Sequence, residues 1–165
     1  MKKVYLAGPD VFAPNASEIA EQHKKLCVAY GFEPLHPADG VEKTAQGIYT
    51  ANINLINSAD AVVANLNPFR GAEADSGTAF EVGYAVALGL PVIGYMTEPT
   101  TVRNQVQQFY GPIFFDQEKQ QWLDQNEYLV EDFDLAVNLM LGVSCDLIFG
   151  DFMAAIIHLQ RRWYD

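Results

Sequence analysis

Two carboxylates lie close together in a stretch of the chain that is otherwise uncharged. Between Asp75 and Glu98 the only charged side chain is Glu81, within the apolar segment 76–88. A helix that is apolar on every face is a buried helix, and an unpaired charge is costly to bury. Glu81 must therefore be hydrogen-bonded, neutral or functional. Two carboxyl groups beside a glycine-containing loop are typical of sites that combine an acid with a nucleophile.

Each of these candidates also has a structural interpretation. If Ser76 caps the helix, Glu81 lies in its first or second turn, where the positive helix end favours an ionised carboxylate. Glu81 could then be a partly solvated residue stabilised by the helix dipole, and Asp75 could be a capping residue. Tyr5 precedes the Gly8-Pro9 turn, so its hydroxyl could reach the site or make one buried hydrogen bond in the core.

The predicted elements place both carboxylates at an edge of a sheet where ligands bind. Apolar runs predict strands at 3–7, 32–36, 59–65, 91–95 and 146–149. Helical spacing predicts helices over 15–30, 47–57, 76–88, 131–141 and 151–163. The alternation predicts an α/β fold, a Rossmann-like or flavodoxin-like three-layer sandwich with a central, about five-stranded parallel sheet. Ligands of such sheets bind beyond the carboxyl ends of the strands, where segment 67–76 emerges.

Composition and the motifs that are missing narrow the class of protein. The length of 165 residues predicts one domain over 1–165. The formal net charge of −11 disfavours nucleic acid and anionic membranes as partners. No apolar window suits a signal peptide or a transmembrane helix, so we expect a soluble cytoplasmic protein. No glycine-rich dinucleotide or Walker-type loop follows the first strand, and the three histidines lack metal-binding spacing.

Three blocks of the sequence resemble the nucleoside 2-deoxyribosyltransferase family. They are Tyr5-Leu-Ala-Gly-Pro9 followed by Val11-Phe12, then Asn65-Leu-Asn-Pro-Phe-Arg-Gly71, then Asp75-Ser-Gly-Thr-Ala-Phe-Glu-Val-Gly83. The blocks keep the order and spacing of the family, and the similarity extends from Lys3 to about Leu141. The ordered set is more specific than any one of its motifs.

The resemblance implies an enzyme without cofactor or metal that moves 2-deoxyribose between nucleobases. Its substrates would be 2′-deoxynucleosides and free nucleobases. Glu81 matches the family's nucleophile, Asp75 the group that handles the proton of the base, and Tyr5 a tyrosine that orients the nucleophile. Asn138 matches an asparagine that reaches the sugar 5′-hydroxyl of the adjacent subunit, which implies a homo-oligomer with a shared active site. The residues expected to bind substrate are Gly8, Phe12, Asn52, Phe69, Arg70, Gly71 and Asn138.

The implied reaction is a double displacement. A carboxylate at C1′ can trap an oxocarbenium-like state as a covalent ester, and two displacements give net retention. The expected intermediate is a deoxyribosyl ester of Glu81, formed while Asp75 protonates the leaving base. One departure concerns Asn52, where many bacterial members of the family carry Asp. An asparagine can hydrogen-bond a base edge but cannot titrate, which affects base preference rather than the reaction.

Two other functions remain open on the residues alone. A deoxynucleoside 5′-monophosphate N-glycosidase on the same scaffold would need phosphate donors after the first strand, yet the loop 8–15 has an Asp and no basic residue. A non-catalytic nucleotide-binding module would not need a lone carboxylate inside an apolar helix. Segment 97–128 shows no clear period and matches the family poorly, so an insertion or a lid is expected there.

Overall fold

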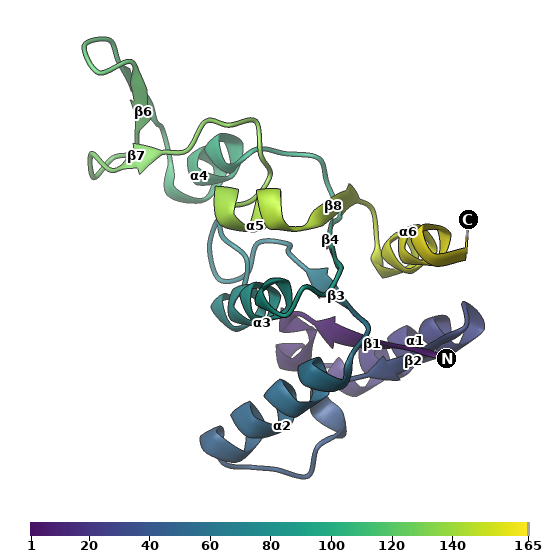
Figure 1. Cartoon of the computed structure of the whole chain (residues 1–165). Coiled ribbons are helices and arrows are strands. Elements are labelled where there is room, and N and C mark those ends of the chain that lie inside the picture. The colour runs from purple at the N-terminus through teal and green to yellow at the C-terminus, as the bar shows by residue number, and fades with distance from the viewer. Residues whose placement is uncertain (165) are drawn as a thin grey trace.

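A computed structural model describes residues 1–164, and a five-stranded sheet lies at its centre (Figure 1). In spatial order the strands are β2 (Phe32–Leu35), β1 (Lys2–Ala7), β3 (Ala61–Asn65), β4 (Val92–Met96) and β8 (Asp146–Phe149). Every neighbouring pair is parallel, which confirms the predicted α/β fold. The observed strands begin and end within two residues of the predicted ones.

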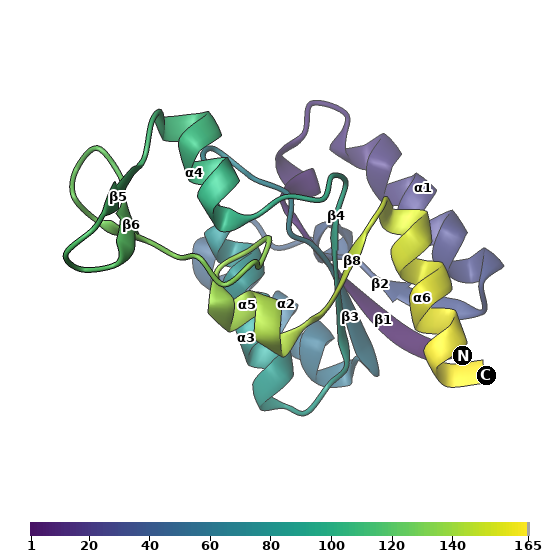
Figure 2. The same cartoon turned by 90° about the horizontal axis from the view of Figure 1, so that it is seen from above.

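Helices cover both faces of this sheet. One face carries α1 (Ala16–Ala29) and α6 (Phe152–Tyr164), and the other carries α2 (Ala45–Ser58), α3 (Ser76–Ala87) and α5 (Leu139–Ser144) (Figure 2). Among residues 1–164, no helix is both long and apolar enough to cross a lipid bilayer.

The alternation of side chains along β1 directs Tyr5 towards α3. Val4 and Leu6 are buried with residues of α1 and α6, whereas Tyr5 is buried with Val82 and Ala85 of α3. Successive side chains of a strand point to opposite faces of the sheet. Tyr5 is fully buried, so its hydroxyl needs a partner on the α3 side.

Short turns follow the strands at their carboxyl ends. The 3-10 turn η1 (Pro9–Phe12) follows β1, and a second one, η2 (Pro37–Asp39), follows β2. The loop after β3 runs into the first turn of α3. These three segments are the walls that the sheet provides for a site.

The helix predicted over 131–141 is wrong for residues 131–138. Residues 131–138 form an irregular segment, and α5 begins only after it, at Leu139. The Glu131 carboxylate accepts hydrogen bonds from the Asn138 side chain (2.6 Å) and the Leu139 backbone N–H (3.0 Å), so it closes a loop at this point. The apolar residues Ala136 and Val137 are buried against the core, but without a helical backbone.

The segment expected as an insertion or a lid has its own structure. Helix α4 (Val102–Tyr110) is followed by a small antiparallel sheet that projects from the body of the protein (Figure 1). Its strands are β5 (Phe114–Asp116), β6 (Gln121–Leu123) and β7 (Leu129–Val130).

Candidate active site

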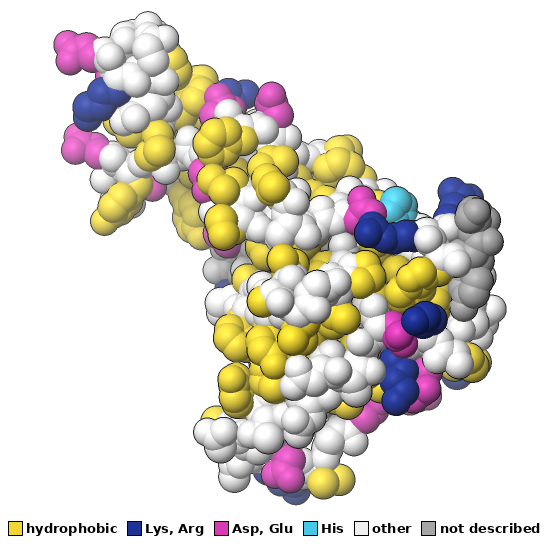
Figure 3. Space-filling view, in the orientation of Figure 1, with side chains coloured by type: hydrophobic (Ala, Val, Ile, Leu, Met, Phe, Trp, Pro, Cys, Tyr) yellow, Lys and Arg dark blue, Asp and Glu magenta, His cyan; other side chains and the backbone are white. Residues whose placement is uncertain are grey.

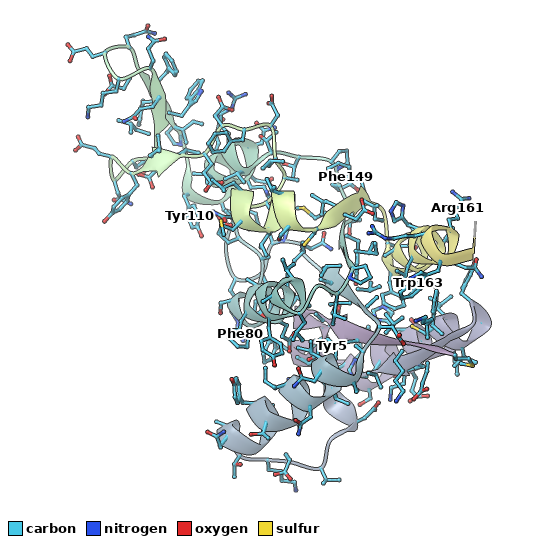
Figure 4. The ribbon with its side chains drawn as sticks, viewed as in Figure 1. Tyr5, Phe80, Tyr110, Phe149, Arg161 and Trp163 are labelled. Carbon is cyan, nitrogen blue, oxygen red and sulfur yellow. The ribbon has the colours of Figure 1, made fainter. Side chains whose placement is uncertain are left out.

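Glu81 is held by two side chains from other elements. The Tyr5 hydroxyl on β1 donates a hydrogen bond to Glu81 Oε1 on α3 at 2.6 Å. Asn52 Nδ2 on α2 donates to the same oxygen at 3.4 Å. In Figure 4 the labelled Tyr5 lies where β1 passes beneath α3, the helix that carries Glu81. The charge inside the apolar helix therefore has partners, and Glu81 Oε2 makes no hydrogen bond within residues 1–164.

Burial dominates the electrostatics of this carboxyl. It raises the pKa of Glu81 to about 7, the hydrogen bond from Tyr5 lowers it, the charge of Asp75 raises it, and the hydrogen bond from Asn52 lowers it. Glu81 lies in the second turn of α3, and its pKa is raised rather than lowered there. Burial also raises the pKa of Tyr5, so its phenol remains the donor of the pair.

The capping interpretation of Asp75 is confirmed, and Ser76 is not the cap. Asp75 Oδ2 accepts hydrogen bonds from the Thr78 backbone N–H (2.9 Å) and the Thr78 hydroxyl (3.0 Å). Asp75 Oδ1 makes no hydrogen bond with any described residue. A cap of this kind uses one carboxylate oxygen and leaves the other available to a ligand.

Asp75 and Glu81 share a pocket of about 390 Å³, which is the size of small-molecule sites in proteins. The loops after β1 and β2 form its other walls together with α2. Its lining residues are Gly8, Val11, Phe12, Pro37, Ala38, Gly40, Glu42, Ile48, Asn52, Asp75, Gly77, Thr78 and Glu81. The pocket thus brings together five of the predicted site residues, and Tyr5 contacts it through Glu81.

Asn52 presents an unpaired acceptor beside this pocket. Its Nδ2 faces Glu81, while its Oδ1 is buried and has no hydrogen-bond partner. A buried acceptor without a partner is costly, so this amide is an unsatisfied polar group next to Glu81.

Two predicted substrate-binding residues contact the pocket only through Phe12. The Phe12 and Phe69 rings stack at 5.5 Å between centroids, and the Arg70 guanidinium lies over both rings, 5.4 Å from Phe12 and 4.7 Å from Phe69. Phe12 is 57% exposed, so the stack forms an outer rim of the pocket. Phe69 and Arg70 hold that rim in place.

Gly71 has a structural role in this conformation. Its φ is +154°, and a Cβ at this position would lie 2.3 Å from the Tyr110 hydroxyl of α4. That hydroxyl accepts a hydrogen bond from the backbone N–H of Ala72 at 3.2 Å. The segment expected as a lid thus fixes the loop that leads into Asp75, and the prediction missed Tyr110 because its partner is a backbone group.

Asn138 lies on the opposite side of α3 from Glu81. It caps α5 and contributes to a second groove between α3 and α5, which also contains Ala79 and Gly83. Within one chain Asn138 is therefore not part of the pocket. Glu42 and Ile48 also line the pocket and were not predicted as site residues, although their position after β2 could have indicated them.

No group of three or more His, Cys, Asp or Glu in residues 1–164 could hold a metal ion. The pocket offers carboxylates and an amide, and the Tyr5 phenol lies behind Glu81.

The raised pKa of Glu81 predicts a pH-dependent effect on stability. When the pKa of a carboxyl is higher in the folded than in the unfolded chain, the free energy of unfolding falls as the pH rises from the unfolded pKa through the folded pKa. The folded chain then has to bury the charge. Glu81→Gln keeps an acceptor for Tyr5 and removes the charge. We expect its Tm to exceed that of the wild type at pH 8, and the difference to shrink at pH 5.

Thermal unfolding at the two pH values measures this, with Glu18→Gln on the exposed surface of α1 as the control. A difference in Tm that is the same at pH 5 and pH 8 would contradict the raised pKa.

Comparison with known sequences supplies the family. The model for nucleoside 2-deoxyribosyltransferases matches residues 4–140. An uncharacterized protein of Schizosaccharomyces pombe is 38% identical over 122 residues, which are 66% of this chain and 58% of that protein. The chain thus spans less than two thirds of the length of this relative.

Solved structures agree with the sequence match. A 2-deoxyribosyltransferase of Leishmania mexicana has a TM-score of 0.81 and 35% identity, covering 99% of each chain. A CMP N-glycosidase of Clostridium botulinum has a TM-score of 0.54 and 15% identity, covering 98% of this chain and 99% of that one, which is a likeness of fold alone. The chain belongs to the nucleoside 2-deoxyribosyltransferase family.

Proposed function

We propose that this protein transfers 2-deoxyribose between nucleobases through a covalent ester on Glu81. The observation that carries the proposal is the 2.6 Å hydrogen bond from the Tyr5 hydroxyl to Glu81 Oε1 at the wall of a pocket that also contains Asp75. The bond fixes one carboxylate oxygen and leaves Oε2 for attack. Family membership supports the same chemistry.

In the first displacement Glu81 Oε2 attacks C1′ of the deoxynucleoside. The C1′–O bond forms, the C1′–N bond breaks, and its electron pair leaves with the base, which takes a proton from Asp75. In the second displacement the nitrogen of an incoming base attacks C1′, its proton passes to the Asp75 carboxylate, and Glu81 leaves as a carboxylate. Two inversions at C1′ give net retention.

The pKa of Glu81 gives this reaction an acid limb. Attack requires the ionised carboxylate, and with a pKa of about 7 much of the free protein holds Glu81 protonated at neutral pH. The rate at low substrate concentration should therefore rise with pH up to about 7. The hydrogen bonds from Tyr5 and Asn52 lower the pKa of Glu81, so without them the acid limb would lie at higher pH.

The charge of the pocket favours a nucleoside over a nucleotide. The described residues that line it include the carboxylates Glu42, Asp75 and Glu81 but no lysine or arginine. A 5′-phosphate inside the pocket would meet these carboxylates, and Arg70 is engaged over the Phe12 and Phe69 rings at the outer rim. Hydrolysis of a deoxynucleoside monophosphate, which the fold shared with a CMP N-glycosidase suggests, therefore has less support than base exchange.

The protein that performs this reaction would be a homo-oligomer with Asn138 of one subunit at the pocket of another. Exposed apolar side chains on α2, α3 and α5 support this assembly, and apolar side chains cover that part of the surface in Figure 3. We call them the apolar surface, consisting of Ile48, Tyr49, Phe80, Val86, Met140 and Val143. It extends from the pocket to the groove of Asn138, as a shared site would require.

Base exchange tests the proposed function. The protein, incubated with a 2′-deoxynucleoside and a different free base, should form the new deoxynucleoside, measured by chromatography. Glu81→Ala should lower this rate by at least about a thousandfold, because it removes the nucleophile, while Glu18→Ala on exposed α1 serves as the matched control.

An active Glu81→Ala variant would remove the assigned nucleophile. Release of free sugar at one rate, whether or not an acceptor base is present, would show a hydrolase instead.

Mixing two inactive variants tests the shared site. Asn138→Ser keeps a hydroxyl to cap α5 but loses the amide, and Glu81→Ala loses the nucleophile. If subunits exchange in a symmetric dimer, an equal mixture should regain about a quarter of the wild-type activity, because one site of each mixed dimer is intact. A mixture as inactive as its components, although subunit exchange is shown by differential labelling, would place Asn138 outside the site.

A further inference from the structure

A carboxylate outside the proposed chemistry fixes the wall of the pocket that η1 forms. Asp10 is in the middle of this turn, between the lining residues Gly8 and Phe12. Both of its carboxylate oxygens lie within hydrogen-bond distance of Asn65 Nδ2, at 3.2 and 3.1 Å. Asn65 ends β3 and is only 9% exposed. The turn is therefore tied to the neighbouring strand rather than free at the surface.

The same asparagine continues a chain of hydrogen bonds across the edge of the sheet. Asn65 Oδ1 accepts from the backbone N–H of Asn67 (3.1 Å) and from Asn67 Nδ2 (2.7 Å). Asn67 Oδ1 in turn accepts from the backbone N–H of Thr97 (2.9 Å). The loops after β1, β3 and β4 are thus joined by three side chains, and Asp10 is the member that reaches the pocket wall.

Gly8 makes this contact possible. A Cβ at position 8 would lie 2.8 Å from Asp10 Oδ2 and 2.9 Å from the Asn65 Cβ. Both distances are shorter than real Cβ contacts. Its φ of 163° is ordinary extended backbone, so the requirement for glycine is one of space and not of backbone conformation. The glycine next to the pocket is explained by the pair behind it.

We propose that Asp10 and Asn65 are positioning residues that set how tightly the pocket holds its substrate. This inference rests on the proposed function, because it assigns the η1 wall to the binding of the deoxynucleoside. Neither residue touches Glu81, Tyr5 or Asp75 through any hydrogen bond of the described chain. Loosening the pair should therefore change KM much more than kcat.

Asp10 has a second set of neighbours that could explain it differently. It lines a cavity of about 10 Å³ together with His23, His36 and Tyr95. Burial lowers the pKa of both histidines, while the charge of Asp10 raises it. If Asp10 served these side chains, moving its charge to position 65 would not preserve its role. If it serves Asn65, exchanging donor and acceptor should preserve the contact.

Swapping the side chains of Asp10 and Asn65 tests the inference. Asn65→Asp alone sets two carboxylates about 3 Å apart, which is strongly repulsive. It should raise KM for the deoxynucleoside about tenfold or more, with a much smaller change in kcat. Combining it with Asp10→Asn restores a donor and an acceptor, and the carboxylate introduced at position 65 still accepts from Asn67. The double variant should return KM to within about threefold of the wild type.

Hydrogen exchange gives a readout that does not depend on activity. Backbone amides of residues 9–13 should exchange faster in Asn65→Asp and at nearly the wild-type rate in the double variant. Asp10→Ala removes the acceptor without adding a charge and should also raise the hydrogen-exchange rates of residues 9–13. The inference can therefore be tested even if Asn65→Asp does not fold. If the wild type shows no base-exchange activity, the proposed function is wrong. The hydrogen-exchange rates of residues 9–13 then still test whether Asp10 and Asn65 hold the turn.

Three results would overturn the inference. One is a double variant no better than Asn65→Asp in KM and in exchange at 9–13, or one that does not fold. Another is a loss confined to kcat with KM unchanged. The third is Asp10→Ala with wild-type KM and wild-type exchange at 9–13.

Discussion

The need of one buried carboxylate for a donor organises this structure. Glu81 is the only charge within an apolar helix that packs on the sheet, and Tyr5 satisfies it from the central strand β1. The two residues are 76 positions apart, and only the stacking of α3 on β1 brings them together. Fold and proposed reactivity thus depend on the same contact, because the layer that forms the core also holds the proposed nucleophile.

Burial and hydrogen bonding act on that carboxyl in opposite directions. Desolvation makes it a better base and raises its pKa to about 7, while the bonds from Tyr5 and Asn52 limit the rise. A fully exposed glutamate would be ionised but strongly solvated, and one buried without donors would remain protonated. The proposed chemistry needs a carboxylate that is desolvated and still ionisable near neutral pH. In the proposed reaction Asp75 acts from the helix cap, where Oδ2 is bound to Thr78 and Oδ1 makes no hydrogen bond with any described residue.

The parts of the fold that sequence could predict are those controlled by local periodicity. The apolar runs predicted the strand that carries Tyr5 and the buried helix that carries Glu81, and the helix start predicted Asp75 as a candidate cap. The segment 131–138 was mistaken for a helix, because its apolar residues follow a helical spacing in the sequence, whereas Glu131 closes a loop through backbone and side-chain bonds.

Contacts between segments that are distant in the sequence could not be predicted from local sequence patterns. The direction of the Glu81 pKa shift depends on its burial among three elements, and Gly71 is explained by Tyr110, which lies in a segment without a recognisable period.

The central claim is that Glu81 forms a covalent bond with the sugar. Acid quenching during turnover with a 2′-deoxynucleoside, followed by peptide mass spectrometry, tests it most directly. A deoxyribosyl adduct on the peptide containing Glu81, absent in Glu81→Gln, is the predicted result; turnover with no adduct, or with one on another residue, would contradict it.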